Sequence, residues 1–141
     1  MTGARAVKKK ITDLYDAINS HELARFMSAW GDDGVFIYPG EIPSSGTFQG
    51  KGAVEEWFRK FFEQFTKIQF DIQDVCVRSV LGLGGSNIVA VHWNLHLTNR
   101  EGRVGQNNGV TVFKIKDASV VQMKDFIFDL GRNFRLHWNA A

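Results

Sequence analysis

Three polar residues with alternate spacing are the first candidates for chemistry in this sequence. His92, Asn94 and His96 are separated by single apolar residues within the segment 88–98. Successive side chains of a β-strand point to opposite faces, so these three would share one face. Imidazole exchanges a proton near neutral pH, which suits acid/base catalysis. A polar row opposite an apolar row also fits the solvent side of a sheet, and spacing does not decide between the two.

Asp125 is the second candidate, because on a strand it would share a face with Met123 and Ile127. Burial beside apolar side chains raises the pKa of a carboxyl group and suits it to proton transfer. A partner such as His92 or Asn94 would have to hold it in place. A surface aspartate paired with a lysine is the alternative that the spacing leaves open.

No metal or cofactor is expected from the sequence. His92 and His96 would lie about 13 Å apart on a strand at ~3.3 Å per residue, too far to share one ion. Asn94 is a poor zinc ligand, and no further ligands follow at the spacing of zinc sites. Glycine-rich nucleotide motifs and GxSxG are absent, and Cys76 has no recognisable nucleophile context.

Composition predicts one ordinary globular domain over residues 1–141. The net charge is +2, and Lys8 to Lys10 form the only basic cluster, so nucleic-acid binding is disfavoured. No stretch approaches 18 apolar residues, no signal-peptide core precedes the first helix, and Cys76 is the single cysteine. We therefore expect a cytoplasmic protein with no membrane partner. Twelve Phe, four Trp and two Tyr would suit a roomy apolar cavity.

Helical periodicity marks the first half of the chain. Apolar residues recur at spacings of three and four over 4–18, 23–30 and 54–65, which predicts three helices. A short strand is expected over 35–38. The segment 39–50 holds both prolines and three glycines and is expected to be a loop.

The period then changes to two, which predicts strands near 68–80, 87–98, 104–115 and 120–128. Their short connections favour antiparallel pairing of sequence neighbours. Helices followed by a long sheet indicate an α+β fold, in which three N-terminal helices pack against a curved, mainly antiparallel sheet. Such a sheet forms a cone with an internal pocket. The tail 129–141 is expected to cover part of the structure.

Several segments resemble the SnoaL-like polyketide cyclases of the nuclear transport factor 2-like superfamily. The matching segments are Asn19-Ser-His-Glu-Leu, Trp30-Gly-Asp-Asp-Gly-Val-Phe-Ile-Tyr-Pro, Gly50-Lys-Gly-Ala-Val-Glu-Glu-Trp-Phe, Gly109-Val-Thr-Val-Phe-Lys-Ile-Lys-Asp and Met123-Lys-Asp-Phe-Ile-Phe-Asp-Leu. The resemblance spans nearly the whole chain and implies the cone-shaped fold. It does not fix the reaction, because this superfamily includes cyclases, isomerases, hydrolases, dehydratases and noncatalytic modules.

The resemblance excludes two of these reactions. Where ketosteroid isomerases have a Tyr and two Asp residues, this sequence has Leu14, Tyr38 and Thr111, although Tyr15 is adjacent to the first position. Where limonene epoxide hydrolases have an Arg and two Asp residues, it has His92, Asn94 and Asp125. The general base and both oxyanion donors of the isomerases are therefore absent, and only Asp125 remains of the two acids that activate water in the epoxide hydrolases.

The resemblance also implies an orientation for the polar rows. In relatives, the faces that match His92, Asn94 and His96, and those that match Met123, Asp125 and Ile127, line the cavity. SnoaL-like cyclases use a last-strand Asp and scytalone dehydratase uses pocket histidines. Asp125, His92 and His96 are accordingly the expected catalytic residues. The expected substrate-binding residues are Asn94, Tyr38, Tyr15, Trp57, Phe58, Thr111, Phe113, Met123 and Ile127.

The sequence thus predicts an acid/base enzyme of the cyclase, isomerase or dehydratase type, acting on a mostly apolar, ring-sized substrate. The alternative is a noncatalytic module of the same fold that binds a ligand or a partner chain. Relatives often dimerise through the convex sheet face. Trp93, Leu95 and Leu97 would form an apolar patch there, so a homodimer is expected.

Overall fold

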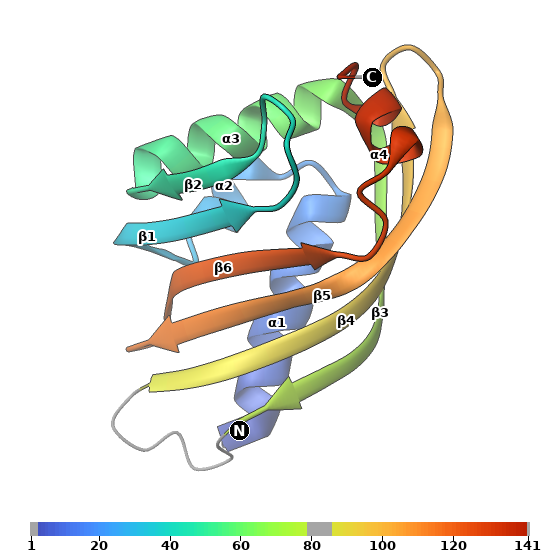
Figure 1. Ribbon diagram of the computed structural model, residues 1–141. Helices are drawn as coiled ribbons and strands as arrows, with labels where there is room; N and C mark the ends of the chain where they lie inside the picture. Colours follow the sequence, from blue (N-terminus) through green and yellow to red (C-terminus); the bar gives the residue numbers. More distant parts are fainter. Residues whose placement is uncertain (1–2, 79–85, 141) are drawn as a thin grey trace.

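A curved sheet backed by helices on one face makes up the computed structural model, which describes residues 3–78 and 86–140 (Figure 1). Its elements in chain order are α1 (Gly3–Asn19), α2 (Leu23–Met27), β1 (Trp30–Tyr38), β2 (Gly46–Gln49), α3 (Lys51–Gln64), β3 (Phe65–Val77), β4 (Ser86–Asn99), β5 (Val104–Lys116), β6 (Ser119–Ile127) and α4 (Arg132–His137). The predicted α+β class is confirmed. No helix among these residues is both long and apolar enough to cross a membrane.

The six strands form one sheet in the order β2-β1-β6-β5-β4-β3. All neighbours pair antiparallel except β1 and β6, which are parallel. The long strands β3, β4 and β5 curl together, so the sheet has an inner, concave face toward the helices and an outer face (Figure 1). The predicted antiparallel pairing of β3, β4, β5 and β6 with their sequence neighbours is confirmed.

Two amphipathic helices close the inner face. The stripe Ile11, Leu14, Tyr15 and Ile18 of α1 is buried, and α1 packs against β3. The third helix, α3, packs against β1 with Val54, Trp57, Phe58 and Phe61 buried. The wide aromatic arc of α3 is thus enclosed between β1 and its neighbours, because water would otherwise contact several rings at once.

The first strand begins earlier than the sequence suggested. The second helix ends at Met27, and Trp30, which was assigned to that helix, opens β1. Trp30 is buried in the sheet, and a register shift separates it from Val35. Gly34 makes this bend possible, since a Cβ there would lie 2.5 Å from the Trp30 ring. The irregular segment between Trp30 and Val35 hid the strand period.

Two other boundaries differ from the prediction. The expected loop 39–50 contains the short strand β2, which pairs antiparallel with β1 from Val35 to Tyr38. Phe65, assigned to the third helix, opens β3 and is fully buried there. The predicted strand end at 79–80 and the glycines that follow it lie outside the described residues.

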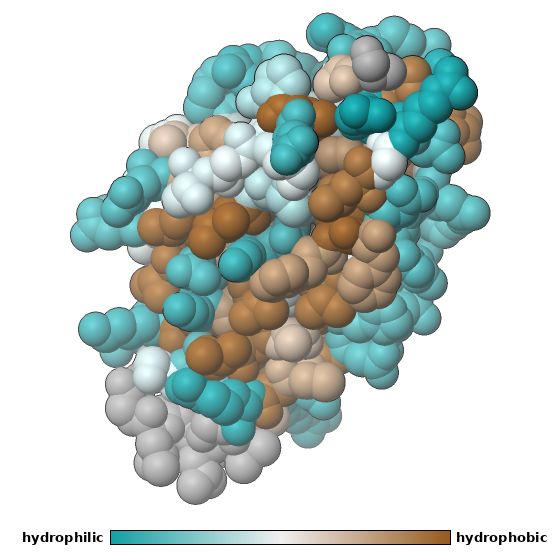
Figure 2. Space-filling model, viewed as in Figure 1, coloured by the Kyte–Doolittle hydropathy of each residue, from teal (hydrophilic) through white to brown (hydrophobic). Residues whose placement is uncertain are grey.

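The residues predicted to form an apolar patch on the convex face do not lie on that face. Trp93 is 1% exposed and Leu95 6%, and both lie on the inner face with the cavity. A different group of apolar side chains covers the outer face of β4, β5 and β6 (Figure 2). This group includes Phe126, which is 45% exposed, and Phe128, which is 61% exposed. The Lys124 ammonium lies 5.0 Å from the centre of the Phe126 ring.

Candidate functional site

A small enclosed cavity lies between the inner sheet face and the helices α1 and α3. Its volume is about 20 Å³, enough for about one water molecule. Among the described residues, Asp125 is the only carboxylate that lines it. The lining residues are Ile18, Tyr38, Trp57, Phe58, Phe61, Phe70, Trp93, Leu95, Leu97, Met123, Asp125 and Ile127.

A chain of two hydrogen bonds holds the Asp125 carboxylate. Asp125 lies on β6 directly opposite Thr111 of β5, and it is 8% exposed. The Thr111 hydroxyl donates to Asp125 Oδ1 at 2.7 Å, and Trp93 Nε1 donates to Thr111 Oγ1 at 2.9 Å. Because the indole can only donate, it forces the single Thr111 hydroxyl proton toward the carboxylate. The second carboxylate oxygen is left for the cavity.

Burial raises the pKa of Asp125 to about 7, and the hydrogen bond from Thr111 opposes part of this rise. Desolvation disfavours the charged form, while a donor to the carboxylate favours it. Near neutral pH the group is therefore divided between its acid and base forms. A group in this condition can both take and return a proton, which general acid/base catalysis requires.

Two tyrosines stand close to this carboxyl group. The Tyr38 hydroxyl accepts a hydrogen bond of 3.0 Å from Trp138 Nε1. Burial raises the pKa of Tyr38, and the Asp125 charge adds to the rise. Tyr15 lies behind Thr111; burial raises its pKa well above the ordinary value, and its hydroxyl makes no hydrogen bond within the described residues. Both phenols therefore stay protonated and can act as neutral donors.

The histidines do not face the cavity, contrary to the prediction from the resemblance. Thr111 pairs with Val91 across β4 and β5, so Val91 and Trp93 share the face of Asp125, whereas His92 points outward. His92 Nδ1 lies 3.1 Å from Asp74 Oδ2 on the outer face.

His96 and Asn94 lie on the same outer face as His92. The ring nitrogen Nε2 of His96 lies 3.6 Å from Asp71 Oδ2, and the side chain is about half exposed. Both residues border an open groove outside the sheet. The sequence correctly predicted that these three side chains share a face. That face does not line the cavity, and its two histidines contact aspartates of β3.

The remaining expected residues divide into two groups. Tyr38, Trp57, Phe58, Met123 and Ile127 line the cavity beside Asp125. Phe113, Thr111 and Tyr15 are buried next to them, with the Tyr15 and Phe113 rings 6.1 Å apart. The prediction missed the walls formed by Trp93, Leu95 and Leu97. The apolar half of the alternation over 88–98 was the signal, since the apolar face of a strand usually turns to the core.

No cluster of three or more His, Cys, Asp or Glu residues suited to a metal ion occurs in 3–78 or 86–140. The outer ion pairs of His92 and His96 each join one imidazole to one carboxylate. The cavity itself presents a single carboxylate among aromatic and aliphatic walls.

The sequence matches the SnoaL-like domain over residues 11–123. This match covers the two main helices and nearly all of the sheet through Met123. The chain belongs to the SnoaL-like family. No curated protein matches it.

Three solved structures share this fold at low sequence identity. An NTF2-like protein of unknown function from Burkholderia pseudomallei K96243 is 17% identical, with coverage of 92% of this chain and 95% of that one and a TM-score of 0.75. TerC, co-crystallised with polyporic acid, is 15% identical, with coverage of 92% and 94% and a TM-score of 0.72. A protein with a cystatin-like fold from Methylobium petroleophilum PM1 is 16% identical, with coverage of 94% and 82% and a TM-score of 0.70.

Replacing Thr111 with valine should raise the pKa of Asp125 further. Valine keeps the shape but removes the hydroxyl that donates to the carboxylate. Hydrogen bonds to charged groups contribute about 1.5–3 kcal/mol, which corresponds to a rise of about 1–2 pKa units. The rise would be measured by following the ¹³C resonance of the Asp125 carboxyl carbon through a pH titration.

The matched control is Thr47→Val, which makes the same change at an exposed position of β2. It should leave the Asp125 titration unaltered. An Asp125 midpoint that stays in place or falls in Thr111→Val would show that the threonine does not hold the carboxylate.

Proposed function

We propose that this SnoaL-like protein is an acid/base enzyme that removes a proton next to a carbonyl group in a mostly apolar, ring-sized substrate. Asp125 is the base. The observation that carries the proposal is its position as the single carboxylate of an apolar cavity, with a pKa of about 7. A base of this pKa is half ionised at physiological pH and close to the optimum for proton transfer.

Tyr38 is the second functional group in this proposal. When the Asp125 carboxylate takes the proton from carbon, the electron pair of the C–H bond moves toward the carbonyl and forms an enolate. The protonated Tyr38 hydroxyl lines the same cavity and can donate to the enolate oxygen.

The three reaction types expected from the sequence differ only in the following step. Asp125 returns the proton to a different carbon in an isomerase. In a dehydratase the enolate expels a β-hydroxyl group, which leaves as water after accepting the Asp125 proton. In a cyclase the enolate carbon attacks a second carbonyl group of the same substrate, and the alkoxide that forms takes the proton from Asp125. All three need one carboxyl group that alternates between base and acid, and none needs His92 or His96.

A noncatalytic module of the same fold remains the alternative function. Apolar walls and a single polar group are also typical of pockets that only bind small molecules. TerC, a structure with the same fold, was co-crystallised with the small molecule polyporic acid. The buried carboxyl with its raised pKa favours the enzyme, because burying it costs stability and a binding pocket does not require it.

The wild-type protein should accelerate the exchange of the α-protons of 2-tetralone with D₂O, measured by loss of the ¹H NMR signal. This ketone is bicyclic, mostly apolar and has acidic protons next to its carbonyl. The rate should rise through about pH 7 and level off above it, because only ionised Asp125 is a base. Asp125→Asn should lower the catalysed rate at least 100-fold, the usual range for a general base.

The control Asp33→Asn makes the same change at an exposed position of β1 and should keep the wild-type rate. Exchange that persists in Asp125→Asn would refute the role of the carboxylate. Binding of 2-tetralone without faster exchange in the wild type would support the noncatalytic alternative.

We also propose a homodimer that forms through the outer sheet face. The exposed Phe126 and Phe128 make this contact, because Trp93 points inward. Light scattering at micromolar concentration should give the mass of two chains. Phe128→Glu should give the mass of one, because a charge in an apolar contact is costly to desolvate. The control Ala53→Glu adds the same charge on the exposed side of α3 and should remain a dimer. A wild-type protein with the mass of one chain would contradict this proposal.

A further inference from the structure

The cavity beside Asp125 is closed at one end by the C-terminal segment, residues 132–140. In Figure 1 the helix α4 lies against the curled ends of the strands, next to the end of α3. A second small cavity, of about 30 Å³, lies beneath this segment and shares four wall residues with the first. These are Tyr38, Leu95, Leu97 and Ile127. Neither cavity has room for a ring-sized ligand while the segment stays in place.

Trp138 fills the space that such a ligand would need. Its indole stacks on Phe61, with ring centres 5.8 Å apart and planes at 29°, and meets the Phe65 ring edge-on at 5.1 Å. The rings of Tyr38 and Trp57 lie 5.7 Å and 5.6 Å away. With its Nε1 donating to the Tyr38 hydroxyl, the indole makes the contacts expected of a bound planar aromatic molecule.

The far side of Trp138 borders a groove of about 230 Å³. The groove runs along α3 and is lined by Pro43, Ser44, Phe48, Ala53, Glu56, Trp57, Lys60 and Trp138. Trp57 lines both this groove and the cavity beside Asp125. Trp138 therefore lines both the groove and the second small cavity, and that second cavity shares walls with the cavity beside Asp125.

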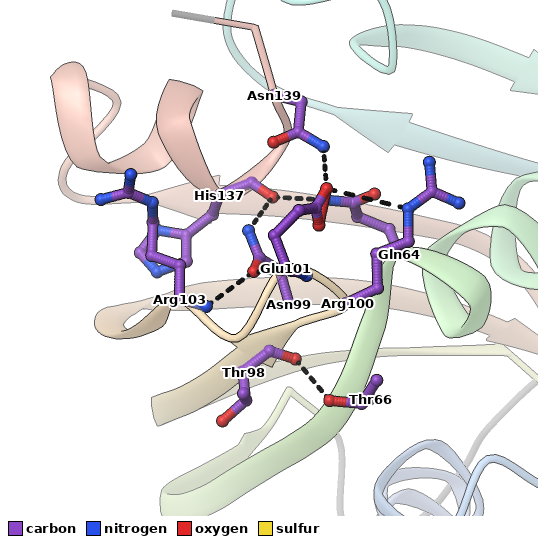
Figure 3. Close-up of polar contacts among 9 residues, drawn as sticks. All are labelled: Gln64, Thr66, Thr98, Asn99, Arg100, Glu101, Arg103, His137 and Asn139. Atoms are coloured by element: carbon purple, nitrogen blue, oxygen red, sulfur yellow. Dashed lines mark hydrogen bonds and ion pairs between the residues drawn. The ribbon is translucent and has the colours of Figure 1, made fainter.

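Polar contacts also hold the C-terminal segment, in addition to the ring contacts of Trp138 (Figure 3). The His137 carbonyl accepts hydrogen bonds from Gln64 Nε2 at 2.7 Å and from Asn99 Nδ2 at 3.3 Å. The side chain of Asn139 donates to Glu101 in the turn after β4. Gln64 and Asn99 are buried, so their amide groups must bond with water or with a ligand when the segment moves.

The lack of a side chain at Gly105 allows the C-terminal segment to pack closely against β5. A Cβ at this position would lie only 2.0 Å from the imidazole ring of His137. Gly105, the second residue of β5, pairs with Leu97, so this space is on the inner face. Alanine at position 105 would push against His137 without touching Trp138 or Asp125.

We propose that Trp138 occupies the outer part of the ligand site, and that the ligand is a planar, fused-ring aromatic molecule that displaces it. A hydroxyl group on this ligand replaces the indole N–H as the donor to Tyr38, while the reacting part of the ligand extends toward Asp125. The inference rests on the proposed function only in taking the cavity beside Asp125 as the ligand site. The chain thus carries an internal occupant that competes with its own ligand.

Competition of this kind lowers the apparent affinity for the ligand. When only a fraction of the molecules has the site open, the apparent Kd equals the intrinsic Kd divided by that fraction. Any change that unseats the segment raises the open fraction and tightens binding by the same factor. A wall residue that merely contacted the ligand would have the opposite effect when it is removed.

The test measures binding of 2-naphthol, a flat fused-ring phenol, by isothermal titration calorimetry. Trp138→Ala and Gly105→Ala should each bind it at least ten-fold more tightly than the wild type. The Gly105 variant is needed because it keeps the indole, whereas Trp138→Ala also leaves an artificial hole. The control Gly52→Ala makes the same glycine-to-alanine change where a Cβ meets no atom within 4 Å, and should bind as the wild type does.

A second measurement follows Trp138 in the unmodified chain. In protein labelled with 5-fluorotryptophan, the ¹⁹F resonance that is lost in Trp138→Phe belongs to this residue. It should move to the shift of a solvent-exposed indole as 2-naphthol saturates the protein. The other three tryptophan resonances should remain those of buried rings.

Tighter binding in Trp138→Ala alone, with Gly105→Ala unchanged, would overturn the proposal, as would a Trp138 resonance that keeps its buried shift at saturation. Failure of all these proteins to bind 2-naphthol would overturn it too.

Asp125→Asn should still bind 2-naphthol, and the ligand should still displace Trp138 in this variant. If 2-naphthol displaces Trp138 but the protein does not accelerate proton exchange of 2-tetralone, the proposed reaction is refuted and the ligand site stands. If exchange is accelerated but Trp138 is not displaced, only the displacement is refuted.

Discussion

The rest of the site depends on one costly feature, a carboxyl group buried on the inner face of an aromatic sheet. Ionised Asp125 loses its hydration and receives a single strong hydrogen bond in return, from Thr111. One donor does not compensate for the lost water, so the acid form is favoured and the pKa rises to about 7. The same balance that makes the group unfavourable for stability makes it suitable for proton transfer.

The surrounding fold supplies what this carboxyl group needs to remain in place. Antiparallel pairing sets Thr111 directly opposite Asp125, and the next pair of strands brings Trp93 within reach of the threonine. The indole fixes the direction of the threonine hydroxyl. The helices α1 and α3 then exclude water from the inner face. The C-terminal Trp138 donates a hydrogen bond to the hydroxyl of Tyr38, which lines the cavity beside Asp125.

Much of this arrangement could be predicted from the sequence, because it follows from local periodicity. The stripes of α1 and α3, the strand meander and the apolar neighbours of Asp125 are each visible within a few residues. Alternation over 88–98 divided the side chains into two faces but did not decide which face was inside. That choice depends on cross-strand register, and the bond from Trp93 to Thr111 joins residues that are 18 positions apart. The resemblance assigned the wrong face to the histidines for the same reason. The place of Trp138 among rings from β1, α3 and β3 depends on contacts that no local pattern encodes.

The pH dependence of stability tests the central claim, that Asp125 is buried with a raised pKa. Its ordinary pKa of 3.8 applies to the unfolded chain, so between about pH 4 and pH 7 the folded protein holds a proton that the unfolded chain releases. The contribution of this proton is fully present below pH 4 and is lost as the pH rises through 7. Urea unfolding of the wild type and of Asp125→Asn should therefore diverge by about 4 kcal/mol between pH 4 and pH 8, with the wild type losing stability relative to the variant. A difference in unfolding free energy that stays constant over this range would contradict the account.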